Sequence, residues 1–224
     1  MKQHHYVSRY LWFVLGVLIN SFGVALITQA ALGTSPISSI PYVLSLRFPI
    51  TLGEFTFILN LVYILGQIVL LRRAFQPIQL LQIAVNVIFS AFIDVSMNLL
   101  SWLQPDHIVV KLIALILGCA ILGVGISIEV APDVLVVPGE GIVRAMTQVS
   151  GKRFGSVKVF FDCTLVAIAL VLSFLFFHGL NGLGLGTVIS ALIIGRFVNL
   201  YNRYLPLIPY LRGLAAAPVT EADS

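Results

Sequence analysis

The chain has 224 residues, of which 59% are apolar and only 10% are charged. A soluble domain is about half apolar and about one quarter charged, so the few polar residues of this chain cannot cover a surface that faces water. The composition therefore predicts an integral membrane protein and excludes a cytosolic enzyme, a secreted disulfide scaffold and a disordered chain. The net charge of +4 is spread too thinly to indicate a nucleic-acid partner.

Six apolar runs are long enough to cross a bilayer core about 30 Å thick, which requires about 20 helical residues. The predicted spans are 11–31, 55–71, 78–100, 112–131, 157–177 and 183–202. Six spans place both termini on the same side of the membrane.

The basic residues orient these spans. If both termini are cytoplasmic, most of the basic loop residues lie inside, and only Arg47 and Lys111 lie outside. The inside set is Lys2, Arg9, Arg72, Arg73, Lys152, Arg153, Arg203 and Arg212. This distribution follows the positive-inside rule and predicts cytoplasmic termini.

The chain also matches itself at an offset of 102 residues, from the first span into the second, and at 105 in the third spans. The offset of 102 pairs Gly23 with Gly125, Pro36 with Pro138 and Gly53 with Gly155, whereas that of 105 pairs Asp94 with Asn199. We therefore expect an all-α protein built from two three-span repeats, 1–106 and 107–210, followed by a cytoplasmic tail over 211–224. Because three is an odd number, the second repeat enters the membrane from the opposite side, and the repeats are inverted.

Each repeat carries a helix too short to span the bilayer after its first span. Pro36 and Pro138 suit the first position of these half-helices, which are predicted over 36–46 and 138–149. A re-entrant half-helix would point its partly positive N-terminus at a site near the midplane. The alternative is an interfacial helix that lies along the membrane surface.

The candidate site residues lie around these two breaks. Thr34, Ser35 and Ser38 are the polar residues of the first break, and Glu140 and Arg144 share one helix face in the second. Other ionisable residues in or beside apolar runs are candidates for coupling groups or structural ion pairs: Glu129, Asp133, Lys158, Asp162, Arg196 and Asp94. No metal-ligand spacing, cofactor motif or nucleophile–base pattern is present, so the sequence predicts neither a metal, a cofactor nor an enzyme.

Two sets of residues carry a resemblance to a family. The run from Ala30 to Pro36 with Ile50-Thr51-Leu52-Gly53, and the later segments 184–187 and 191–195, resemble the YczE/YitT group of small bacterial membrane proteins. The resemblance covers nearly the whole chain and implies a multi-pass protein of the bacterial inner (plasma) membrane. The second copy departs from the pattern, because it has Val137-Pro138 followed by Glu140 where the first has Ser35-Pro36.

The leading functional hypothesis is a secondary transporter of a small polar or zwitterionic solute. The neutral first break would hold an anionic or polar group of the solute, and Glu140 would take a cationic group or a proton. Two alternatives stay open: a substrate-binding membrane subunit that works with a separate ATPase, and an accessory or regulatory membrane factor without transport. The lipid bilayer is the expected partner of the outer helix faces. Helix faces with small residues are compatible with a homodimer.

Overall fold

The structure is a computed structural model that describes residues 2–216 and the side chains of residues 7–214. These residues form helices and connecting segments, with no strand among them. The long helices are α1 (Lys2–Gln29), α3 (Leu52–Leu71), α4 (Gln82–Leu99), α5 (Ile108–Val130), α7 (Phe154–Phe177) and α8 (Leu185–Tyr204). The short ones are η1 (Pro36–Ser38), α2 (Ser39–Arg47), η2 (Arg72–Ala74), η3 (Pro77–Leu81), α6 (Pro138–Ser150) and α9 (Leu207–Ala216).

Within the described part of the chain, six helices are long and apolar enough to cross a membrane. They correspond to the six long helices named above, so the prediction of an all-α chain with six helices suited to span a membrane is confirmed. The largest difference in position is at α1, which begins nine residues before the predicted span. Both predicted short helices are present, as η1 with α2 and as α6.

Local sequence explains where several helices begin and end. Thr51 and Glu54 form a capping box that starts α3, in which each side chain accepts a hydrogen bond from the other residue's backbone N–H. Pro36 and Pro138 occupy the first positions of η1 and α6 and have no N–H that a partner must satisfy. Gly151 ends α6 in the left-handed conformation that glycine adopts without strain.

Helices α1 and α5 cross closely because glycines remove the side chains between them. A Cβ on Gly23 would lie 2.6 Å from the Leu122 backbone nitrogen, and one on Gly125 would lie 2.5 Å from that of Asn20. Lipid tails are as apolar as leucine side chains, so close backbone packing, rather than hydrophobic burial, holds such a pair together in a membrane.

The contacts across this crossing are reciprocal. We call two residues repeat partners when the offsets of 102 or 105 pair them. Gly23 faces Leu122, and its partner Gly125 faces Asn20, which is the partner of Leu122. In the same way, Gly16 faces Glu129, and its partner Gly118 faces Ile27, the partner of Glu129.

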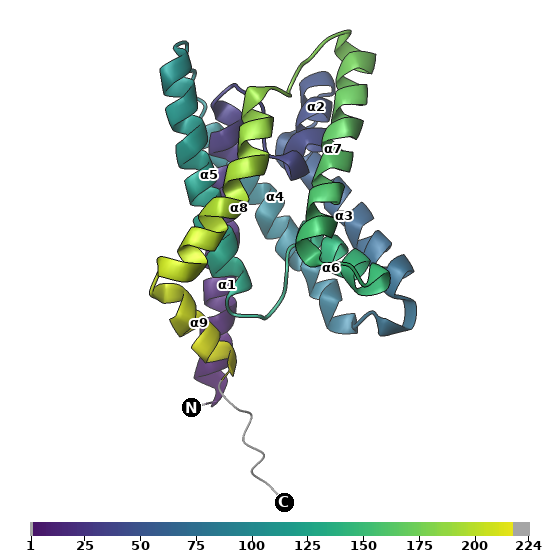
Figure 1. Cartoon of the computed structure of the whole chain (residues 1–224), viewed down its shortest axis with the longest axis vertical. Coiled ribbons are helices and arrows are strands. Elements are labelled where there is room, and N and C mark those ends of the chain that lie inside the picture. Colours follow the sequence, from purple (N-terminus) through teal and green to yellow (C-terminus); the bar gives the residue numbers. More distant parts are fainter. Residues whose placement is uncertain (1, 217–224) are drawn as a thin grey trace, which may run out of the picture.

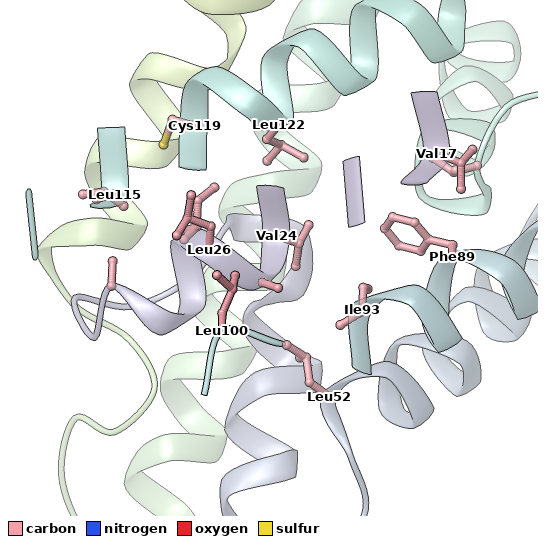
Figure 2. Packing of buried hydrophobic residues seen from close by; sticks show 14 of the residues in the cluster. Val17, Val24, Leu26, Leu52, Phe89, Ile93, Leu100, Leu115, Cys119 and Leu122 are labelled. Atoms are coloured by element: carbon pink, nitrogen blue, oxygen red, sulfur yellow. The ribbon is translucent and has the colours of Figure 1, made fainter. Parts of the chain in front are cut away.

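The buried side chains form three clusters. The largest joins α1, α4 and α5, and Figure 2 shows Val24 and Leu122 from facing helices packed with Phe89 and Ile93 of α4. A second cluster joins α2, α3, α6 and α7. Here α2 packs on α7 and α6 packs on α3, so each short helix contacts the second span of the other half. In Figure 1, α2 and α6 lie toward opposite ends of the molecule.

The third cluster attaches α9 to the bundle. Ile208 and Leu211 are fully buried against Ile128 and Ala131 at the end of α5. The predicted tail over 211–224 is therefore helical as far as Ala216 and packed on the bundle at Leu211, and residues 217–224 lie outside the described part.

The crossing predicts a sharp difference between two mid-helix glycines. Gly125→Ala should destabilise the fold by about 1–3 kcal/mol, because the added methyl group meets the backbone of α1. Gly195→Ala in α8 is the matched control, since a Cβ there meets nothing within 4 Å. Thermal unfolding of both variants in detergent measures the difference, and equal unfolding temperatures would contradict the described α1–α5 crossing.

Candidate functional site

A cavity of about 540 Å³ lies at the centre of the bundle. Its lining comes from α1, η1, α2, α3, α4, α5, α6, α7 and α8, together with residues just before η1 and α6. This volume falls within the range of pockets that enclose organic ligands. Both halves of the chain contribute, so the cavity lies between them.

Many lining residues are repeat partners of one another. The pairs are Asn20 with Leu122, Val24 with Ile126, Ser35 with Val137, Ile37 with Gly139, Ser38 with Glu140, Thr56 with Lys158, Asn60 with Asp162 and Phe89 with Ile194. Where the first half contributes the neutral polar residues Ser38, Thr56 and Asn60, the second contributes charged ones. The two halves therefore line one cavity with unequal chemistry.

The predicted residues of the first break divide into two groups. Ser35 and Ser38 line the cavity, and the Ser35 hydroxyl donates a hydrogen bond of 3.0 Å to that of Ser38. Thr34 is outside the lining and fully buried. Its hydroxyl pairs with that of Thr28 at 2.8 Å, and its backbone N–H donates to Thr187 in α8, so it holds the break against neighbouring helices.

Three ionisable residues line the charged side of the cavity. Lys158 and Asp162 form the ion pair that their spacing predicts, with 2.7 Å between Nζ and Oδ1. Glu140 is half-buried at the start of α6. The charges of Lys158, Arg144 and Asp162 act on it, although Arg144 is exposed and outside the lining.

Glu129 lies behind the cavity wall and is fully buried. Its carboxylate accepts a hydrogen bond of 2.9 Å from the Asn20 side-chain amide of α1. It also accepts one of 3.3 Å from the backbone N–H of Val137, the residue before α6. One carboxylate therefore joins α1, α5 and the start of the second short helix.

Arg9 supports the same connection from outside. Its guanidinium donates to the carbonyl oxygens of Pro132 and Asp133, which follow α5, at 2.9–3.0 Å. Asp133 itself is exposed and has a positive φ of 48°, so it lies in the turn between α5 and α6. Arg196 is exposed on α8 and lies outside the cavity lining.

Neutral amides seal the contact between α3 and α4. The Asn60 amide donates to that of Asn86 at 2.7 Å, and Gln67 and Gln82 exchange two hydrogen bonds of 3.0 and 3.2 Å. The candidates predicted from the sequence were hydroxyl and ionisable residues, so these four amides were missed. Their spacing was the available signal, because Asn60 and Gln67 are seven residues apart and Gln82 and Asn86 four apart, which places each pair on one helix face.

Asp94 closes the far end of the same contact. Its carboxylate accepts from the Gly53 backbone N–H at 2.8 Å and from the Thr51 hydroxyl at 2.6 Å. Asp94 therefore lies away from the central cavity, where it caps the start of α3.

The corresponding helices of the second half are separated. Helices α7 and α8 touch at most marginally, and Figure 1 shows them diverging from their connecting loop toward the end where α1 begins. Gly53 is packed against Ser90 and Asp94, whereas a Cβ on its repeat partner Gly155 would meet nothing within 4 Å. The cavity is lined on this side by Gly155 of α7 and Asn199 of α8, which are the repeat partners of Gly53 and Asp94.

These features define a membrane protein with six membrane-crossing helices and a central cavity lined by both halves of the chain. The chain belongs to the family DUF6198, a family of unknown function, which it matches over residues 7–203.

Two proteins of Bacillus subtilis (strain 168) are similar to it. The uncharacterized protein YyaS is 25% identical over 86% of this chain and 92% of its own length. The uncharacterized membrane protein YczE is 27% identical over 87% of this chain and 85% of its own length, which confirms the resemblance to the YczE group. No solved structure gives a significant match.

The buried carboxylate gives a prediction about stability. Glu129→Ala should destabilise the fold by about 1–3 kcal/mol for each donor left without a partner, namely the Asn20 amide and the Val137 N–H. Asp106→Ala, at an exposed loop position, is the control. Unfolding temperatures in detergent provide the measurement, and a Glu129→Ala variant as stable as this control would show that the carboxylate does not hold α6 in place.

Proposed function

We propose that the chain is a secondary carrier that moves a small solute with a polar group across the bacterial inner membrane by alternating access between two inverted repeats. The observation that carries this proposal is the central cavity lined by eight pairs of repeat partners. Carriers built from inverted repeats bind their solutes between the repeats, near the bilayer midplane.

The reciprocal contacts support the inversion. In a twofold arrangement, if one residue contacts another, their counterparts make the same contact. The Gly23–Leu122 and Gly125–Asn20 contacts follow this pattern, and so does the exchange of short helices between halves. Ile37 of η1 and its partner Gly139 of α6 also contact each other directly, as expected for partners near such an axis.

The burial of the short helices supports the re-entrant interpretation. Three successive residues of α2, Ser39, Ile40 and Pro41, are buried, and so are five of the first six residues of α6. An interfacial helix would leave one face in contact with lipid or water along its length. The starts of both short helices border the cavity instead, where protein and a wet cavity can satisfy their backbone groups.

The difference between the two halves supports a state open on one side. The α3–α4 contact is sealed by amide pairs and by Asp94, whereas α7 and α8 are apart. The basic residues Arg153, at the start of α7, and Arg203, at the end of α8, favour the cytoplasm as the open side under the positive-inside rule. In the opposite state, α7 would close on α8 while α3 and α4 separate.

The open faces of α7 and α8 suit such a closure. Gly155, Ala191 and Gly195 all line the cavity, and a Cβ on either glycine would meet nothing within 4 Å. Small residues let two helices approach closely in a membrane. Closure would place Gly155 beside Asn199, as Gly53 lies beside Asp94 in the first half.

A cross-linking experiment tests this closure without knowledge of the solute. In a chain with Cys119→Ala and Cys163→Ser, the pair Gly155→Cys and Asn199→Cys should form a disulfide on oxidation in membranes, because the two positions meet transiently in the closed state. The yield is measured as the fraction of chain that resists a thiol-alkylating reagent.

A matched pair provides the control. Gly155→Cys with Leu192→Cys places the second thiol on α8 at a side chain that is 63% exposed and outside the cavity lining, so it should stay reduced. If the first pair stays reduced as well under all conditions, α7 does not close on α8 and the carrier proposal is wrong.

A further inference from the structure

The walls of the central cavity divide into a charged face and an apolar face. Glu140, Lys158 and Asp162 are supplied by α6 and α7. On the other side, α5 and α8 contribute apolar side chains, including Leu122, Ile126 and Ile194. A solute that uses the whole cavity therefore needs both a charged group and an apolar part.

The charges of the cavity do not balance. Lys158 and Asp162 neutralise each other at 2.7 Å, which leaves the Glu140 carboxylate. Among the described residues, that carboxylate has no hydrogen-bond or ion-pair partner. Arg144 acts on Glu140 from outside the lining, where it is exposed. The side chains that line the cavity therefore carry a net negative charge, which favours a cation.

The hydrogen-bonding groups of the wall can also accept from a donor of the solute. Five side chains of the lining already donate to other protein groups: Asn20 to Glu129, Ser35 to Ser38, Thr56 to Leu52, Asn60 to Asn86 and Ser190 to Thr187. Their oxygens keep free lone pairs, because a hydroxyl or an amide oxygen can accept more than one hydrogen bond. The ammonium group of a solute can therefore donate to these oxygens as well as to Glu140.

We propose that this cavity binds an amphipathic monocation, with an ammonium group against Glu140 and an apolar body against α5 and α8. The inference rests on the proposed carrier function, whose solute class it names. It narrows the polar or zwitterionic solute of the sequence-based hypothesis, in which the first break would hold an anionic group. Thr34 lies outside the lining, the Ser35 hydroxyl donates to Ser38, and Lys158 is paired with Asp162. The volume of about 540 Å³ leaves room for a body larger than an amino-acid side chain.

Four probes with a common chain length test the charge preference: hexylammonium, hexanol, hexanoate and the zwitterion norleucine. Each is titrated into the full chain in detergent at neutral pH, with the thermal unfolding temperature as the readout, since a ligand that binds only the folded state raises it. Hexylammonium should stabilise the protein more than hexanol does, and hexanoate and norleucine should have no effect beyond that of hexanol.

Two substitutions with opposite expected effects locate the site. Glu140→Gln should weaken hexylammonium binding about tenfold or more, since a hydrogen bond to a charged group contributes about 1.5–3 kcal/mol. Lys158→Gln should strengthen it, because Asp162 then becomes available to the cation. Asp106→Asn removes an exposed carboxylate outside the cavity lining and should leave hexylammonium binding unchanged. A folding defect cannot produce tighter binding, so the Lys158 variant separates loss of the site from loss of structure.

Either of two results overturns the inference: hexanoate or norleucine stabilises the chain as much as hexylammonium, or the Glu140→Gln variant binds hexylammonium as the parent does. The failure of the inference and that of the carrier proposal are distinguishable. If positions 155 and 199 cross-link but hexylammonium is not preferred, the carrier proposal stands and the proposal of a cationic solute is wrong. If hexylammonium binding depends on Glu140 but no cross-link forms, the cavity binds a cation and the carrier proposal is wrong.

Discussion

The close crossing of α1 and α5 is the constraint on which the rest of the structure depends. Glycines at four repeat-related positions let the two backbones touch, and in a membrane such packing is a main source of helix association. The crossing brings Asn20 of α1 next to Glu129 of α5. Glu129 in turn accepts a hydrogen bond from Val137, and this contact fixes where α6 begins and so where Glu140 enters the cavity. The position of the charged site therefore follows from the contact between two apolar helices.

The two halves line one cavity with different chemistry. Neutral amides close α3 on α4, and the repeat partners of Asn86 and Gln82 are Ala191 and Thr187, which cannot form the same amide pairs with α7. The polar groups of the second half face the cavity instead, as Glu140, Lys158 and Asp162. A sealed first half and an open, charged second half are what the proposed carrier requires for a site that is accessible from one side at a time.

Composition and hydropathy were enough to predict the six long helices, because lipid demands long apolar runs and leaves few alternatives. Pro36 and Pro138 located the short helices to within a residue or two, since proline fixes the start of a helix. The site was less accessible to prediction. Thr34 was expected to bind solute, yet it bonds to Thr28 and Thr187, and Asp94 caps α3. The neighbour that a side chain contacts depends on how each helix is rotated and on which helices pack together. Residue types in the sequence do not determine either of these, so the partners of Thr34 and Asp94 could not be predicted.

The most direct test of the account is a pair of spin-label distances measured by electron paramagnetic resonance in liposomes. Ile58 and Val95, on α3 and α4, are the repeat partners of Phe160 and Leu200, on α7 and α8, and all four side chains are exposed on the outer surface of the bundle. Two alternating states predict that each pair has a shorter and a longer distance, with opposite populations: mostly short for 58–95 and mostly long for 160–200. A single distance for each pair, unchanged by pH, ion gradient or hexylammonium, would contradict alternating access and reduce the two halves to a static scaffold.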